Sequence, residues 1–320
     1  MLKKPSRIHS ASLSYAPRSL KLVWNRILLL SLMPVFLVIT QLAQAQELPF
    51  GRGLMWQVSK EGVEPSIIYG TFHSSERRVV DSSASAHRKL LTAKSLVIEV
   101  EDDDAIQQRL FETMVYDDGR RLDQLVSPET FEKIKVLGYE YGFLARQMNV
   151  LRPWAAGVMF SFPPSEASRI SLGIRTLDQS LQDLARKQEI EIIALETIQE
   201  QLLALQGEGE EEQILLLTSL PETIQEVEDD FEDLVGDYLS QNVAGLYARK
   251  RQSLAVLPPE KADAYIHRLV TSRNYSMVER MRGMLNKGNV FVAVDALHLP
   301  GHEGILSLLQ AQGYRIEPVK

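Results

Sequence analysis

Two histidines stand at the ends of two apolar segments that lie near opposite ends of the chain. Residues 66–73 read SIIYGTFH, and residues 289–298 read NVFVAVDALH. Apolar runs rich in β-branched residues favour buried strands, and α/β sheets keep their chemistry at the carboxyl ends of their strands. We therefore expect His73 and His298 to share one site if the fold brings the two segments together.

Each histidine is followed by a predicted helix and then by a strand that carries Ile-Glu. The helices are expected over residues 81–94 and 301–312, and the strands read SLVIEV, which contains Glu99, and GYRIEPV, which contains Glu317. Both halves thus follow the order strand, histidine turn, helix, strand. This order is typical of one structural unit used twice. The alternative is a chance similarity, because two such short units can align loosely in any α/β protein.

Two neutral imidazoles and one carboxylate form a ligand set for a divalent metal that leaves positions open for water. Glu99 is the preferred carboxylate, because a charge in an apolar strand needs a metal or a cation as its partner. Glu317 is the weaker candidate, since it lies in the last four residues. The alternatives are structural roles for the histidines and, for Glu99, a strand end that faces the acidic residues 101–104. No HExxH, CxxC, GxSxG or Walker motif supports another mechanism.

The elements that must position these residues indicate an α/β fold. A mixed central sheet is expected from the two similar strand-helix-strand units, with a first strand at residues 54–60 and a turn at residues 61–65. A large, mostly helical insertion at approximately residues 103–288 separates the units and contains one further strand at residues 191–197. Placed over the strand ends, it would form a lid or a substrate wall. Helices within it are predicted over residues 104–116, 128–142, 177–187 and 198–206.

The first 45 residues have the pattern of a secretory signal peptide. Six Lys and Arg precede an apolar run at residues 27–40, and Ala43-Gln44-Ala45 supplies a small-residue cleavage site. The apolar run is shorter than the ~20 residues that span a bilayer, so we expect cleavage after Ala45 and no membrane span afterwards. The alternative is a segment retained as an anchor. Residues 46–320 are expected to form a single domain.

Amino-acid composition limits the expected cellular compartment and the expected classes of binding partner. No cysteine occurs, which suits an exported protein without disulfides in the periplasm or outside the cell. Asp and Glu outnumber Lys and Arg, 42 to 35, and six of the 35 basic residues lie in the leader. This acidic balance disfavours nucleic acid and anionic lipid as partners.

Six segments stand out together: YGTFH, VIEV, LRPW at residues 151–154, LETIQEQL at residues 195–202, Arg273-Asn274, and VAVDALHLPGHEGILSLLQAQGYRIEPV. Together they resemble the TraB/GumN family, which is related to the Tiki proteases and more remotely to the erythromycin esterase and haem-binding ChaN fold. The resemblance covers nearly all of the chain after the leader. It implies that two G-x-x-H motifs and a glutamate bind a divalent metal and catalyse hydrolysis.

Carried onto this sequence, the family pattern places the first motif on Gly70 and His73, the glutamate on Glu99 and the second histidine on His298. Arg273 and Asn274 match a polar pair of the family and are expected to line or order the site; the alternative is a salt bridge and a cap at a helix start. Asp295 stands where the family has its second glycine. Its carboxylate would add a ligand or crowd the metal, although Asp tolerates left-handed backbone better than most residues.

The resulting hypothesis is an exported metal-dependent hydrolase that cleaves a peptide or amide bond with Mn²⁺, Co²⁺ or Zn²⁺. The metal would be held by His73, His298 and Glu99, with Glu99 also able to act as a base. The alternative is a non-catalytic periplasmic protein on the same scaffold that binds a peptide, haem or another small ligand. A structural envelope component without a site is the third possibility.

Overall fold

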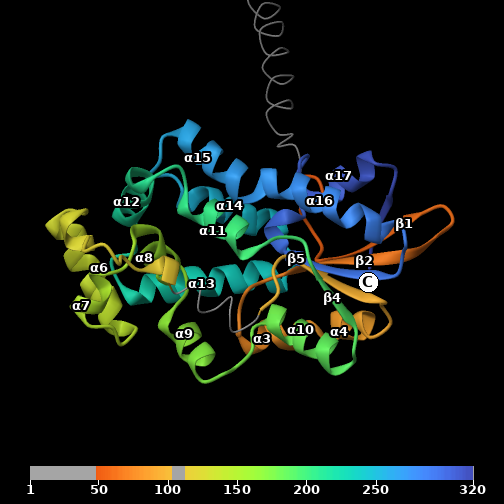
Figure 1. Ribbon diagram of the computed structural model, residues 1–320, viewed down its shortest axis with the longest axis horizontal. Helices are drawn as coiled ribbons and strands as arrows, with labels where there is room; N and C mark the ends of the chain where they lie inside the picture. The colour runs from red at the N-terminus through yellow and green to blue at the C-terminus, as the bar shows by residue number, and fades with distance from the viewer. Residues whose placement is uncertain (1–47, 103–111, 320) are drawn as a thin grey trace, which may run out of the picture. The chain divides into compact units, whose positions relative to one another are not determined.

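Six strands form one mixed sheet in the computed structural model, which describes residues 48–102 and 112–319 (Figure 1). The strand order is β4-β3-β5-β2-β1-β6. β4, β3, β5 and β2 are parallel neighbours, whereas β1 is antiparallel to both β2 and β6. The expected α/β fold with a mixed central sheet is confirmed. The strands are β1 Met55–Lys60, β2 Val63–Thr71, β3 Ser95–Ile98, β4 Glu191–Ala194, β5 Val290–Asp295 and β6 Arg315–Pro318.

The two histidine-bearing units leave the centre of the sheet in opposite directions. The first passes from β2 across β5 to β3, and the second passes from β5 across β2 and β1 to β6. Right-handed crossovers in opposite directions must place their helices on opposite faces. α4 (Ala84–Leu90) accordingly packs on the face that carries Tyr69, and α17 (Ile305–Ala311) packs on the face that carries Ile68. β2 and β5 therefore form the switch point of the sheet, where α/β folds bind ligands.

The helical insertion covers both faces and extends past the carboxyl ends of the strands (Figure 1). α10 and α13 bury apolar side chains on the α4 face, and α16 does so on the α17 face. α6, α8 and α12 share a separate apolar core. The helices are α6 Pro128–Glu140, α7 Ala145–Met148, α8 Pro153–Met159, α9 Pro164–Ser171, α10 Leu177–Lys187, α11 Ile198–Gln206, α12 Glu210–Thr218, α13 Ile224–Leu239, α14 Val243–Ser253, α15 Pro259–Ile266 and α16 Ser272–Leu285.

Helix starts in the insertion follow their capping residues. The side chain of Ser127 accepts a hydrogen bond from the backbone N–H of Thr130 at the start of α6. Thr176 and Thr197 form capping boxes at the starts of α10 and α11, because a hydroxyl and a residue three positions later satisfy each other's free backbone N–H groups. The predicted bounds of α10 and α11 are confirmed, and β4 confirms the predicted strand in the insertion.

The first unit does not contain the single helix expected over residues 81–94. Two short helices take its place, α3 (Arg77–Ser82) and α4, and they meet at Ser83. The hydroxyl of Ser82 donates to the carbonyl of Val79 and that of Ser83 to the carbonyl of Val80. Such side-chain bonds to preceding carbonyls compete with the helical ladder. The expected single helix was therefore wrong.

The second unit begins its helix later than expected. α17 starts at Ile305 rather than at Gly301, because Gly301 has a φ of +95°, which a right-handed helix does not allow. The turn between β1 and β2 is also shorter than expected. It occupies Glu61 and Gly62, and Gly62 supplies the positive φ that a two-residue hairpin needs.

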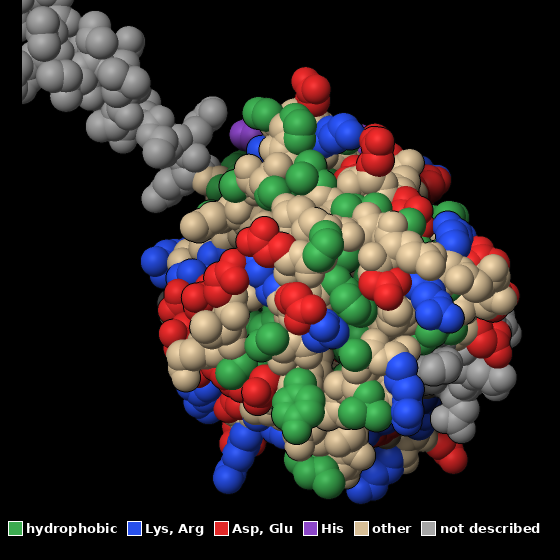
Figure 2. Space-filling model, turned by 90° about the vertical axis from the view of Figure 1, so that its left-hand side faces the viewer, with side chains coloured by type: hydrophobic (Ala, Val, Ile, Leu, Met, Phe, Trp, Pro, Cys, Tyr) green, Lys and Arg blue, Asp and Glu red, His purple; other side chains and the backbone are tan. Residues whose placement is uncertain are grey.

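The predicted signal peptide and most of the helix expected over residues 104–116 lie outside the described residues. In the part of the chain that the structure describes, no helix is long and apolar enough to cross a membrane. The face formed by the helical end of the insertion shows acidic and basic side chains interspersed with exposed hydrophobic ones (Figure 2). Basic side chains do not form a continuous patch on this face.

Candidate active site

Polar side chains collect where the four parallel strands β4, β3, β5 and β2 end. Glu196 follows β4, Glu99 follows β3, Asp295 ends β5, and His73 follows β2. His298 lies in the short 3₁₀ helix that begins directly after β5. Because β2 and β5 pair with Thr71 opposite Asp295, their two loops leave the sheet side by side. The structure thus brings both histidine segments to one edge, as the fold must do if they share a site.

Glu99 is buried, with 7% of its surface exposed, and both of its carboxylate oxygens have partners. Oε2 lies 2.6 Å from Nη2 of Arg273 and accepts a hydrogen bond from the side-chain amide of Gln201 at 3.1 Å. Oε1 accepts from the backbone N–H of Asp295 at 2.7 Å. Glu99 therefore has the charged partner that its burial requires, and this partner is an arginine.

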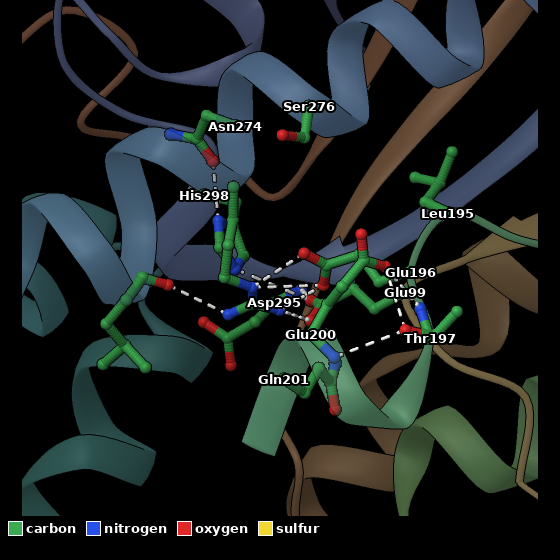
Figure 3. Close-up of polar contacts among 12 residues, drawn as sticks. Glu99, Leu195, Glu196, Thr197, Glu200, Gln201, Asn274, Ser276, Asp295 and His298 are labelled. Atoms are coloured by element: carbon green, nitrogen blue, oxygen red, sulfur yellow. Dashed lines mark hydrogen bonds and ion pairs between the residues drawn. The ribbon is translucent and has the colours of Figure 1, made fainter. Parts of the chain in front are cut away.

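Arg273 binds two buried carboxylates at once. Besides Glu99, its Nε and Nη2 contact the carboxylate of Glu196 at 3.0 Å and 2.6 Å, and its Nη1 donates to the carbonyl of Leu269. Glu99 and Glu196 lie on neighbouring strand ends (Figure 3), where the backbone N–H of Glu196 donates to the carbonyl of Glu99. The planar fork of arginine suits such two-sided binding, which a lysine could not reproduce.

The charges around Glu99 decide its ionisation. Burial alone would raise the pKa of the Glu99 carboxyl, but His298, Arg273 and His73 lower it to about 2. Burial also lowers the pKa of His298 to about 4, against the opposing effect of Glu99. His298 is therefore neutral at pH 7, and the permanent cation that keeps Glu99 ionised there is Arg273.

His298 is almost fully buried, and its orientation is fixed by Asn274. Nδ1 of His298 lies 2.6 Å from Oδ1 of Asn274, whose amide nitrogen donates to the carbonyl of Glu303 (Figure 3). Since the Asn274 nitrogen is committed as a donor, its oxygen must accept, and the proton of the neutral ring is assigned to Nδ1. Nε2 then carries a free lone pair, 3.9 Å from Oε1 of Glu99.

His73 is oriented in the same way by a different residue. Nδ1 of His73 lies 2.9 Å from Oδ2 of Asp178, and the hydroxyl of Thr71 donates to the other oxygen of Asp178 at 2.6 Å. Nε2 lies 3.8 Å from Oδ2 of Asp295. The side chain is half exposed, and the charge of Asp178 is the largest cause that raises the pKa of His73 to about 10. A metal at Nε2 would have to displace that proton.

Asp295 fits its turn without strain. Its φ is −53°, so the position does not require the left-handed backbone that glycine would allow. One carboxylate oxygen accepts from the backbone N–H of Leu297 and the other faces His73. Burial raises the pKa of Asp295 to about 6, although His73 lowers it.

Gly70, the glycine of the first motif, is needed for close packing. A Cβ there would lie 2.7 Å from a methyl carbon of Leu299 and 3.1 Å from Cα of Ala296. The turn that carries His298 therefore rests directly on the backbone of β2. This contact fixes the distance between the two histidine loops.

The donor types at this edge fit a divalent metal. In both His73 and His298, Nδ1 contacts a side-chain oxygen, as the second ring nitrogen of metal-binding histidines generally does. The other ring nitrogen, Nε2, faces a carboxylate. Two ligands of one ion stand roughly 3.0–3.5 Å apart when each bond is about 2.1 Å, so the 3.9 Å between Nε2 of His298 and Oε1 of Glu99 would have to shorten slightly. Over residues 48–102 and 112–319, no three His, Asp or Glu side chains are already close enough to hold an ion.

Three residues of this cluster, Asp178, Glu196 and Gln201, are not among the site residues predicted from the sequence. Glu196 and Gln201 lie within LETIQEQL, so that motif contained a signal for them. Asp178 stands in the first turn of α10, where an acidic residue is common for helix-capping reasons alone. Glu317, the weaker carboxylate candidate, lies on the edge strand β6 and pairs with Arg315, apart from this site.

Histidines and carboxylates thus gather at the switch point of an α/β sheet, the place where ligand sites of such folds usually lie. The model of the TraB/PrgY/gumN family matches residues 54–318. The chain therefore belongs to this family, and the resemblance seen in its motifs is confirmed. No curated protein matches the chain.

Proposed function

We propose that this protein is an exported metal-dependent hydrolase that cleaves peptide or amide bonds. The observation that carries the proposal is the matched orientation of the two histidines. Asp178 and Asn274 each hold Nδ1 of one histidine, and both Nε2 atoms face carboxylates at the switch point. Export to the periplasm or the medium rests on the leader pattern of residues 1–45.

Four residues have distinct roles in the proposed hydrolysis. His73 and His298 would hold the metal through Nε2 and Glu99 through Oε1. A divalent ion such as Mn²⁺, Co²⁺ or Zn²⁺ supplies an activated water and polarises the scissile carbonyl. Arg273 keeps Glu99 ionised, which suits a ligand but makes Glu99 a weak base.

Asp295 is the better candidate for accepting a proton. Burial raises the pKa of its carboxyl above the ordinary range, and a higher pKa makes a carboxylate a stronger base. Its free oxygen faces His73 at the same edge, so a water between the two histidine loops would lie within its reach. The residue that departs from the family motif thus gains a catalytic role in this proposal.

Metal content tests the proposal directly. The purified protein is expected to retain close to one equivalent of divalent metal and to cleave members of an unbiased peptide library. The double variant His73→Ala with His298→Ala is expected to lose both, whereas His302→Ala, an exposed histidine, should keep both. Equal and negligible metal in all three proteins would refute the proposal.

A second candidate is a non-catalytic binding protein on the same scaffold. It is favoured because both carboxylate oxygens of Glu99 already have hydrogen-bond partners. Arg273, Gln201 and the backbone of Asp295 already occupy its oxygens. Such a protein would bind a peptide, haem or another small ligand at the strand ends.

Substitutions at Asp295 separate the two candidates. In the hydrolase, Asp295→Asn keeps an oxygen for the Leu297 N–H and is expected to lower kcat about 100-fold or more with little change in metal content. Asp295→Gly should have the same effect. If the protein is instead a non-catalytic family member that lost activity through Asp295, Asp295→Gly restores the family motif and should raise metal affinity or hydrolysis. Steady-state kinetics and metal analysis of both variants decide between these outcomes.

A further inference from the structure

The loop that carries His73 contains two buried serines. Ser74 and Ser75 are buried, although half of the His73 side chain is exposed. Residues 72–76 are neither helix nor strand, so the helical and sheet ladders leave their backbone N–H groups without acceptors. Buried backbone donors must be satisfied in some other way. The groups that satisfy them determine where the loop holds the His73 ring.

Glu166 of α9 is the main acceptor for this loop, and it is fully buried. Its Oε2 accepts from the hydroxyl of Ser74 at 3.0 Å, and its Oε1 accepts from the backbone N–H of Ser75. The hydroxyl of Ser74 in turn accepts from the backbone N–H of Glu76 at 2.9 Å. One carboxylate therefore holds the three residues that follow His73, two of them directly and the third through Ser74.

Arg169, one turn further along α9, pairs with the charge of Glu166. Its Nη2 lies 2.6 Å from Oε2 of Glu166 and 3.4 Å from Oε2 of Glu76, and its Nε donates to the hydroxyl of Ser75 at 3.3 Å. A buried carboxylate requires such a cation. An ionised carboxylate accepts at both oxygens, whereas a glutamine would turn an N–H donor towards one of these donors. The contacts of Glu166 thus need its charge as well as its shape.

α10 holds the same loop from another direction. The backbone N–H of Leu177 donates to the carbonyl of Ser74 at 2.9 Å, and the carboxylate of Asp178 contacts the ring of His73. Asp178 fixes the rotation of the ring, and Glu166 fixes the backbone that carries it. Both helices belong to the insertion, so the insertion positions the first histidine.

We propose that Glu166 is a positioning residue for His73, acting through the backbone of the loop and not as a metal ligand. The effect on metal binding rests on the proposed hydrolytic site, where Nε2 of His73 is a ligand. Groups outside the ligand set commonly determine metal affinity, because they hold each ligand where the ion needs it. Glu166 performs this task for the loop between β2 and α3.

Calorimetric titration with Mn²⁺ and with Zn²⁺ tests the proposal. Glu166→Gln is expected to weaken metal binding about tenfold or more. Ser74→Ala removes the hydroxyl that Glu166 binds and should also weaken binding. The double variant should lose less affinity than the product of the two single effects, because both substitutions break the same hydrogen bond.

Glu212→Gln is the matched control. Glu212 of α12 is another buried glutamate of the insertion, and it lies 2.6 Å from Nη2 of Arg268. The control therefore removes the same charge from a buried pair elsewhere in the insertion, and it should bind metal as wild type does. Wild-type affinity in a folded Glu166→Gln protein overturns the proposal. Equal losses of affinity in the two glutamine variants also overturn it, since they would indicate a general effect on the fold.

Hydrogen–deuterium exchange of the protein freed of metal with a chelator separates this role from the proposed hydrolase. In Glu166→Gln, the backbone N–H of Ser75 should exchange at least tenfold faster than in wild type. The backbone N–H of Asp295, which donates to Glu99, should exchange at an unchanged rate. If the wild type binds no metal, the hydrolase fails, while faster exchange at Ser75 alone still supports the positioning of the loop by Glu166. Unchanged exchange at Ser75 overturns that positioning.

Discussion

Arg273→Met is expected to lower the free energy of unfolding by about 3–5 kcal/mol, the usual cost of leaving buried charges without their partner. Arg273 is the cation that contacts both Glu99 and Glu196. Both acids are buried, with 7% of the surface of Glu99 and 6% of that of Glu196 exposed. Urea unfolding of wild type and variant at pH 7 measures the difference. A triple variant that also carries Glu99→Gln and Glu196→Gln should recover most of it, because neutral amides are cheaper to bury than carboxylates.

Arg282→Ala on the same helix provides the control. Arg282 pairs with Glu279 on the surface, with about half of each side chain exposed, and such pairs contribute about 0–1 kcal/mol. A folded Arg273→Met protein that is as stable as Arg282→Ala would show that the two buried carboxylates do not depend on Arg273.

The pH dependence of this difference follows from Glu99. Its pKa falls from 4.5 to about 2 in the folded protein, so its ionisation contributes stability above pH 4.5 that disappears as the pH falls through 2. Removal of Arg273 removes one cause of the lowered pKa. The stability gap between wild type and Arg273→Met should therefore narrow as the pH is lowered from 5 towards 2.

Local sequence patterns predict the strands that carry the two histidines, because a β-branched run favours a strand whichever strands it pairs with. The same patterns could not reveal that Arg273 would meet Glu99, since that contact depends on how α16 packs against strands encoded far earlier in the chain. The apolar strand around Glu99 predicts that this carboxylate is buried and that a metal or a cation is its partner. The identity of that cation required the fold.

The orienting partners of the histidines show where sequence reasoning stops. Asn274 matches a family motif, whereas Asp178 belongs to an ordinary helix start and has no separate signal in the sequence. Its role arises only because the start of α10 lies beside the end of β2, where the side chains of Thr71 and His73 contact the Asp178 carboxylate. Similarly, the break at Ser83 depends on two hydroxyl bonds to the backbone that helix periodicity does not detect.

Asn274→Leu is expected to weaken metal binding about 10- to 100-fold, the usual effect of removing the group that orients a metal-binding histidine. This prediction rests on the proposed metal site. Without the Asn274 oxygen, Nδ1 of His298 loses its acceptor, so neither the tautomer nor the ring plane that presents Nε2 is fixed. Calorimetric titration with Mn²⁺ and with Zn²⁺ measures the change.

Two further variants in α16 serve as controls for the effect of Asn274→Leu on metal binding. Asn274→Asp keeps an oxygen for Nδ1 of His298 but loses the donor to the carbonyl of Glu303, so it should retain metal binding better than Asn274→Leu. Ser276→Ala removes a hydroxyl that bonds only within the helix, to the carbonyl of Ser272, and should bind as wild type does. If a folded Asn274→Leu protein binds metal as tightly as Ser276→Ala, Nε2 of His298 is not a ligand. The matched orientation of the two histidines would then serve the fold alone.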